Sequence, residues 1–231
     1  QGLIAGINAA RKLQGKEGIV IDRSQGYIGV LIDDLVTKES HEPYRMMTSR
    51  AEYRLLLRQD NADMRLTKIG YEVGLIDEER YQKLLKKEEM IEKEIERVEH
   101  TNVGTTEAVQ ALLESYESTP LTSGTTLAEL IRRPELSYEK IAPIDKHREE
   151  LPYDVKEQVD INIKYDGYIK RQMRQVEQFK KLENKRIPEN INYDEIQSLR
   201  LEAKQKLNKI RPSSIGQASR ISGVSPADVS V

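Results

Sequence analysis

The sequence predicts a mostly α-helical protein. Of its 231 residues, 33% are charged, 37% are hydrophobic and only 5% are aromatic. This balance is typical of long amphipathic helices with solvated outer faces, and it differs from that of a β-sandwich. Apolar residues also recur at three- and four-residue steps in the longer polar stretches, which is the spacing of one helix face.

The N-terminal end is predicted to hold two helices, at about 1–13 and 27–37. The first has apolar residues at helical spacing and ends near Gly15, a residue that commonly terminates helices. The second carries its apolar residues on one face. The segments 46–49 and 53–57 are predicted to be short strands or an extended loop.

The middle of the chain is predicted to contain one long helix. A short helix at 67–74 precedes it, and Asp77 is its expected N-cap. The apolar periodicity then continues to about His100. Loops rich in Thr, Ser, Gly and Pro at 101–106 and 115–125 indicate a domain boundary.

The rest of the chain is also predicted to be helical. Pro152 suits the first turn of the longest predicted helix, which extends to Leu182. A short helix at 126–133 begins with a capping-box pattern, and a second is expected at 137–141. Further short helices are expected near 198–209, 214–222 and 225–231.

No catalytic or metal-binding group can be identified from the sequence. The chain has no cysteine, which excludes disulfides and thiol nucleophiles, and it has no apolar run of membrane-spanning length. His41, His100 and His147 are far apart and lack metal-ligand spacing. The pair Asp33–Asp34 could bind Mg²⁺, but adjacent acids on a helix point to different sides, so we favour helix-surface charge.

The C-terminal third is basic. Residues 164–220 contain fourteen Lys and Arg against seven Asp and Glu, whereas the whole chain has a net charge of −2. Such an asymmetry favours an acidic partner such as RNA, although solvated helices also carry excess lysine.

An arginine-rich segment at 42–58 is the most informative feature of the chain. It combines two tyrosines, Tyr44 and Tyr53, with four arginines. Arginine binds phosphate through two N–H groups and stacks on bases, and tyrosine adds an aromatic face, so the segment suits RNA binding. Neighbouring acids also permit structural ion pairs. The arginines are Arg45, Arg50, Arg54 and Arg58.

The amino-acid sequences of four segments resemble those of the glucose-inhibited division protein A (MnmG) family. These are the flavin-dependent enzymes that modify the wobble uridine of certain tRNAs at C5. The segments are Gln1–Ala10, Gly26–Leu35, Glu42–Leu66 and Arg211–Val224. They lie in order from one end of the chain to the other, so the resemblance covers all of it.

The resemblance implies a set of functional roles. The whole protein would be an FAD- and NADH-dependent homodimer in the cytoplasm that works with a tRNA-modification GTPase (MnmE). In it, Gln1 and Gly2 would approach the flavin, Arg45 and Arg54 would bind tRNA, and Arg50 and Arg58 would contribute less. Residues 153–231 would dock the GTPase, with RNA contact as a secondary role.

The resemblance also implies that this chain is a carboxy-terminal fragment. Family members carry a Gly-rich FAD-binding turn, and no G-x-G-x-x-G occurs here. We therefore expect residues 1–75 to be an α/β remnant of the flavin domain, followed by helical subdomains at 76–150 and 151–231. We expect the fragment alone to be inactive and to hold no FAD.

Two non-enzymatic alternatives remain open at this stage. The chain could be a helical RNA-binding module or a protein-interaction scaffold, and the salt dependence of binding separates the two. The tail 218–229 resembles half of a helix-hairpin-helix, in which backbone amides bind an anion. Ser225 stands where the usual second glycine would be, so we slightly favour protein contact for the tail.

Overall fold

The computed structural model describes residues 1–38 and 43–231, and His41 and Glu42 lie outside these ranges. The fold is mostly helical, as predicted. Its contacts separate two compact units, each described here by itself. Unit 1 comprises residues 1–58 and 170–231, and unit 2 comprises residues 59–169.

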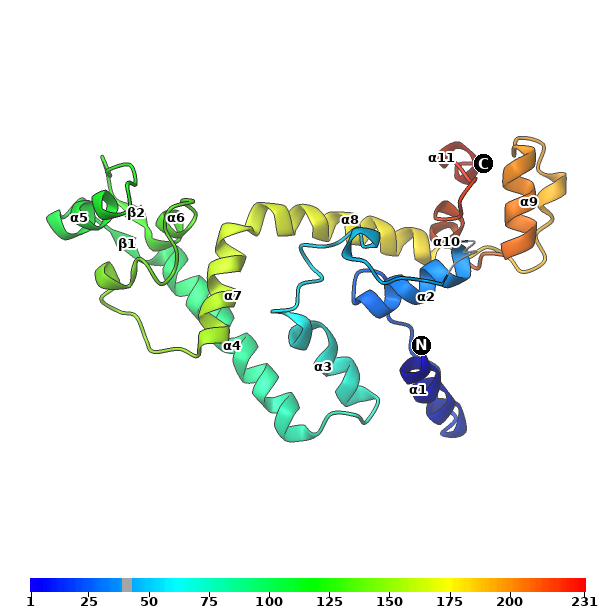
Figure 1. Cartoon of the computed structure of the whole chain (residues 1–231), viewed down its shortest axis with the longest axis horizontal. Coiled ribbons are helices and arrows are strands. Elements are labelled where there is room, and N and C mark those ends of the chain that lie inside the picture. The colour runs from blue at the N-terminus through cyan, green and yellow to red at the C-terminus, as the bar shows by residue number, and fades with distance from the viewer. Residues whose placement is uncertain (39–42) are drawn as a thin grey trace. The chain divides into compact units, whose positions relative to one another are not determined.

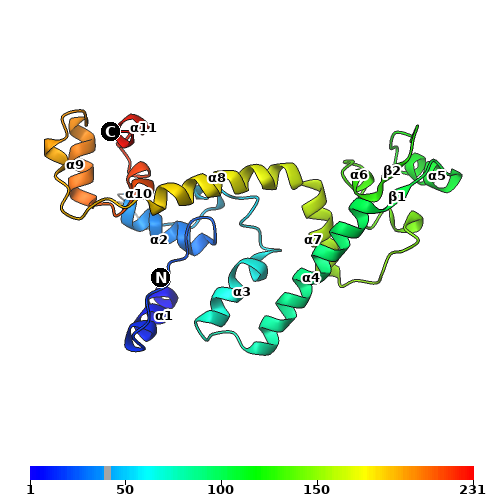
Figure 2. The same ribbon diagram turned by 180° about the vertical axis from the view of Figure 1, so that it is seen from behind.

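Unit 2 is built around the helix α4 (Glu78–His100). The helices α3 (Ala62–Glu72) and α7 (Tyr153–Lys164) pack along α4, as both views show (Figures 1 and 2). The Asp77 carboxylate accepts a hydrogen bond from the Arg80 amide at 2.8 Å, so the predicted cap of α4 is confirmed.

The remaining elements of unit 2 are short. A pair of two-residue strands, β1 (Asn102–Val103) and β2 (Thr125–Thr126), is antiparallel, with Asn102 opposite Thr126. The helix α5 (Glu107–Ser115) separates the strands. The helix α6 (Leu127–Ile131) follows, and the Thr126 hydroxyl accepts from the Glu129 amide, as the capping-box pattern predicted. A 3₁₀ turn at Ala142–Ile144 precedes α7.

The core of unit 2 uses the apolar faces of α4, α6 and α7. Val155, Val159 and Ile163 of α7 are all buried in it, together with Ile91 and Val98 of α4. The first half of the apolar stripe predicted after Pro152 is therefore internal core. This burial removes apolar area from water and is the main stabilising contribution to the unit.

Unit 1 contains segments from both ends of the chain. Its N-terminal elements are α1 (Gly2–Leu13), α2 (Tyr27–Thr37) and a 3₁₀ turn at Thr48–Arg50. Most of α8 (Asp166–Asn184) also belongs to it. The tail adds a 3₁₀ turn at Tyr193–Glu195 and three helices, α9 (Leu201–Ile210), α10 (Ile215–Ser219) and α11 (Pro226–Val229).

Two small cores stabilise unit 1. In the first, Val30 of α2 clusters with Ala51 and Leu57 of the arginine-rich segment, and all three are buried. In the tail, Tyr193, Leu199, Leu207, Ala218 and Ile221 form a separate cluster. The helix α2 approaches the preceding loop very closely at Gly29, where an added Cβ would collide with the carbonyl oxygens of Ile21 and Asp22.

Several sequence predictions need correction. The helix predicted from Pro152 to Leu182 is two helices, because Tyr165 leaves helical geometry (φ −104°, ψ 12°) and Asp166 and Gly167 are poor helix formers. The helix predicted at 67–74 begins at Ala62. The segment 137–141 forms turns and not a helix.

The N-terminal segments predicted as strands also need correction. Residues 46–49 and 53–57 contain a 3₁₀ turn and tight turns, so the extended-loop alternative is closer. No strand occurs among residues 1–38 and 43–75, and the strand part of the expected α/β remnant is not seen there. The three domain ranges stay a prediction, because contact-based units need not follow the segments of a longer protein.

Candidate functional site: an anchored arginine-rich segment

Arg23 is the centre of a charged network in unit 1. It lies in the loop before α2, and only 1% of the residue is exposed. Its guanidinium donates to Asp34 at 2.7 Å, to Asp33 at 2.9 Å and to both carboxylate oxygens of Glu52 at 2.8 and 3.1 Å. It also donates to the Arg50 carbonyl at 3.1 Å. Arg23 therefore fixes the backbone of the arginine-rich segment against α2.

Asp34 is the second anchor of that segment. Its carboxylate is 1% exposed and accepts from the Tyr44 hydroxyl at 2.8 Å and from Lys38 at 2.8 Å, in addition to Arg23. Burial alone would raise the pKa of Asp34, but the hydrogen bonds from Lys38, Arg23 and Tyr44 outweigh it and lower the pKa. Two effects raise the pKa of Tyr44: burial, which is the larger, and the hydrogen bond to Asp34. Asp34 is thus ionised and Tyr44 protonated at neutral pH.

The four arginines predicted to bind RNA fall into two groups. Arg50 and Arg58 are partly buried and are held by the protein itself. The Arg50 guanidinium lies 4.5 Å from the centre of the Tyr44 ring and 3.7 Å from Asp34, and Arg58 donates to the Leu55 carbonyl at 2.6 Å.

Arg45 and Arg54 form the other group. Both are exposed, and neither side chain forms an ion pair or a hydrogen bond with any residue that the structure describes. Their backbone belongs to the segment that Arg23 and Asp34 hold in place. Residues 1–38 and 43–231 therefore leave these two guanidinium groups without a neutralising partner on an anchored loop, a geometry suited to an anionic ligand.

A second arginine, Arg220, joins the tail to α2. It donates to both oxygens of Asp33 at 2.8 Å and to Glu183 of α8 at 2.6 Å, and its guanidinium lies 5.0 Å from the centre of the Phe179 ring. Burial alone would lower the pKa of Arg220, but the hydrogen bonds that it donates to Asp33 and Glu183 raise it. Residues 187 positions apart are thereby held together.

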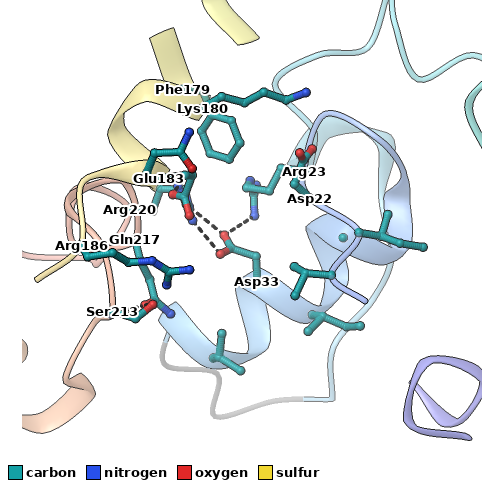
Figure 3. A pocket seen from close by; sticks show the side chains of 16 residues that line it. Asp22, Arg23, Asp33, Phe179, Lys180, Glu183, Arg186, Ser213, Gln217 and Arg220 are labelled. Carbon is teal, nitrogen blue, oxygen red and sulfur yellow. Dashed lines mark hydrogen bonds and ion pairs between the residues drawn. The ribbon is translucent and has the colours of Figure 1, made fainter. Parts of the chain in front are cut away.

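A cavity of about 500 Å³ lies beside this network (Figure 3). Figure 3 shows Asp33 between Arg23 and Arg220, with ion pairs to both. Lys180 and Arg186, at the cavity wall, form no ion pair among the described residues. Because the wall mixes charges of both signs, the cavity has no strong preference for one small charged ligand.

The interpretation of Asp33–Asp34 as surface charge is wrong, because both carboxylates face buried arginines. No group of three or more possible ligands that could hold a metal ion occurs in residues 1–38 and 43–231. The sequence did carry one usable signal: Asp34 lies four residues after Val30, which is fully buried, and hence on the same helix face. Arg23 and Arg220 had no comparable local signal.

The other sequence-predicted positions are peripheral. Gln1 and Gly2 begin α1: Gln1 gives no side-chain cap, and the first turn has no acid. His100 and His147 are exposed.

The turn that precedes α11 in the tail is capped by the tail's own side chains. Ser225 and Asp228 form a reciprocal capping box at the start of α11, and Asp228 also pairs with Arg200 at 2.6 Å. Since the cap uses the amides that an anion would need, this turn is a structural feature of unit 1.

Comparison with known proteins places these features in a family. Residues 78–173 match the model described as the tRNA modifying enzyme MnmG/GidA C-terminal helical domain. Residues 175–231 match the MnmG/GidA C-terminal helical bundle. None of the helices within the described ranges combines the length and hydropathy that a membrane span requires.

Curated relatives extend the match to the whole chain. The tRNA uridine 5-carboxymethylaminomethyl modification enzymes MnmG of Lachnoclostridium phytofermentans and Caldicellulosiruptor saccharolyticus are 70% and 64% identical over all 231 residues. The chain spans 37% of the length of each.

A solved structure gives the same result. The form II crystal structure of Aquifex aeolicus GidA matches all of this chain with a TM-score of 0.83 and 41% identity, over 36% of its own length. The protein therefore belongs to the MnmG/GidA family, and it corresponds to the part of the family that carries the C-terminal helical domains.

Proposed function

We propose that this chain is part of a flavin-dependent enzyme that modifies the wobble uridine of tRNA at C5, and that it supplies contacts to tRNA and to a GTPase partner. The observation that carries the proposal is the 70% identity over every residue with a relative named as a tRNA uridine modification enzyme.

Arg45 and Arg54 are the proposed tRNA contacts. Exposed guanidinium groups bind phosphate through charged hydrogen bonds, and an anchored backbone reduces the entropy lost when they do so. Arg50 and Arg58 would support them, since their own side chains are already engaged with Asp34, Tyr44 and Leu55.

The proposal includes FAD and NADH as cofactors of the whole enzyme. The open, acid-free N-terminus of α1 at Gln1 and Gly2 fits a flavin in one limited respect, because its partial positive charge would stabilise a reduced, anionic ring. FAD would supply the redox chemistry. One helix end offers too few contacts to hold it, so we expect this chain alone to be inactive and free of FAD.

Residues 153–231 are the proposed docking region for the GTPase. Tyr165, Tyr168 and Met173 are 46%, 60% and 47% exposed, and exposed aromatics among basic residues are common at interfaces. The family resemblance adds a homodimer and a cytoplasmic location to the proposal.

The proposed function is tested by measuring tRNA binding to the 231-residue chain. Replacement of Arg54 by Ala, and separately of Arg45 by Ala, is expected to weaken binding of unmodified bulk tRNA by about 1–3 kcal/mol, the magnitude of one charged hydrogen bond. Arg80→Ala is the matched control, because Arg80 is also an exposed arginine and lies in unit 2. Unchanged tRNA affinity with a lowered melting temperature would assign Arg45 and Arg54 to structure.

A further inference from the structure

The outer face of α8 carries a row of unpaired cations. Arg171, Arg174 and Lys181 are all exposed, and with Gln178 they lie within about 80° of one another around the helix, at 100° per residue. The opposite face carries the buried side chain of Val176. We call the three cations the α8 stripe.

No described residue neutralises the α8 stripe. None of its three side chains forms an ion pair or a hydrogen bond with any residue in 1–38 or 43–231. Glu177 lies three residues after Arg174 and four before Lys181, within reach of both, yet no ion pair joins it to either in these ranges. The stripe therefore presents its full positive charge to solvent.

The exposed face of α4, the long helix of unit 2, pairs two of its cations with acids one turn away. On α4, Lys83 pairs with Glu79 at 2.7 Å and Lys93 pairs with Glu89 at 2.6 Å, each one turn apart. Opposite charges at this spacing stabilise a helix by a few tenths of a kcal/mol, so they are the expected arrangement where a face meets only water. The α8 stripe lacks this arrangement, and helix stability does not explain it.

We propose that the α8 stripe binds the phosphate backbone of RNA, as a contact additional to Arg45 and Arg54. The stripe extends over about 15 Å of helix, at 1.5 Å per residue. A nucleic-acid duplex presents one charge per about 3.4 Å of each strand, so several phosphates fall within that length. The stripe contains no aromatic side chain for stacking on bases. It therefore positions RNA independently of sequence.

This inference rests on the proposed function, since it takes tRNA as the ligand, but its test is separate. The probes are labelled bulk tRNA and a 20-base-pair RNA duplex of unrelated sequence, bound to the 231-residue chain between 50 and 200 mM KCl. The test variant replaces Arg171, Arg174 and Lys181 by Gln. The matched control replaces Lys83, Lys86 and Lys93 by Gln, which removes the same charge from the exposed face of α4.

Each phosphate contact contributes about 0.7 to 0.9 to the slope of log affinity against log salt concentration. The test variant, which lacks three contacts, is therefore expected to lower the slope by about 2.1 to 2.7 for both probes. When the salt concentration rises fourfold, the affinity of the test variant should therefore fall by a factor about 20 to 40 times smaller than the factor for the wild type. The control variant should keep the wild-type slope. Both variants should keep the wild-type helical circular dichroism.

Four results would overturn the inference. Equal slopes in the test and control variants would mean that only net charge matters. If the test variant keeps the wild-type salt dependence of RNA binding but no longer binds the GTPase, the stripe is a protein-binding surface. Weaker binding in the Arg45 and Arg54 variants, with no effect of the stripe variant, would leave the proposed function intact and remove this inference alone. A wild-type chain that does not bind tRNA would contradict both.

Discussion

Replacement of Arg23 by Ala is expected to open unit 1 locally and to weaken tRNA binding without removing any tRNA contact. Arg23 donates six hydrogen bonds, to three carboxylates and to the carbonyl oxygens of Val30 and Arg50. The variant removes a side chain that joins the loop before α2 to the acids of α2 and to the arginine-rich segment.

The magnitude follows from what each partner retains. Removal of one member of a buried ion pair costs about 3–5 kcal/mol, because the other charge is left without compensation. Here Asp34 keeps Lys38 and Tyr44, and Asp33 keeps Arg220. The Glu52 side chain is 48% exposed and returns to water. The expected loss is therefore near the lower end, about 3 kcal/mol, and most of it comes from Asp34 and the two carbonyl oxygens.

Hydrogen exchange at the amides of α2 measures this loss directly, because it reports the opening free energy of one unit independently of the other. Arg23→Lys keeps the charge but cannot bind two carboxylates in a fork, and about half of the loss is expected. Arg80→Ala, at an exposed arginine, should change stability by no more than about 0.5 kcal/mol. If the α2 amides of Arg23→Ala exchange within about 1 kcal/mol of the wild type, the network does not hold this segment and the reasoning fails.

Three further predictions concern α2 and α8. The pKa of Asp34 is lowered in the folded state, so its contribution to stability is present above its unfolded pKa of about 3.9 and is lost as the pH falls through the folded value. Urea unfolding from pH 7 to pH 2.5 should show wild type and Asp34→Asn converging in acid, and a constant difference would contradict the assignment. Gly29→Ala should destabilise by about 1–3 kcal/mol or more, because the added Cβ meets backbone carbonyls of Ile21 and Asp22. Gly167→Ala, where a Cβ meets nothing within 4 Å, should stabilise α8 by about 0.5–1 kcal/mol, and thermal melts of both variants check the pair.

Helix positions were predictable where the signals are local. The helices at 2–13, 27–37 and 78–100 match the predicted ranges closely, since periodicity and caps operate within a few residues. The break between α7 and α8 also had a signal that the prediction of one helix missed. Ile169 lies six positions after Ile163, and a step of six positions moves the apolar stripe to another face of the helix.

The segment 43–58 was less predictable because its structure depends on the rest of the fold. Its tyrosines and Thr48 favour strands locally, but no neighbouring strand is available within the described ranges, and α2 packs against it instead. The same dependence applies to its charges. Nothing in the sequence distinguishes Arg50, which lies on Tyr44, from Arg45, which is exposed.

Ion pairs between residues far apart in the sequence hold unit 1 together, and local sequence patterns could not predict them. From α8, Glu183 pairs with Arg220, Arg220 with Asp33, and Asp33 with Arg23, which holds the Arg50 carbonyl. This continuous series of ion pairs leads from the inner face of α8 to the segment that presents Arg45 and Arg54.

A second connection reinforces it, because the Tyr53 ring lies 6.0 Å from that of Phe179 on α8. The two proposed RNA-binding surfaces thus both belong to unit 1. Pre-organisation lowers the entropic cost of binding, so in the proposed complex the buried arginines would contribute to RNA affinity through structure and the exposed ones through direct contact.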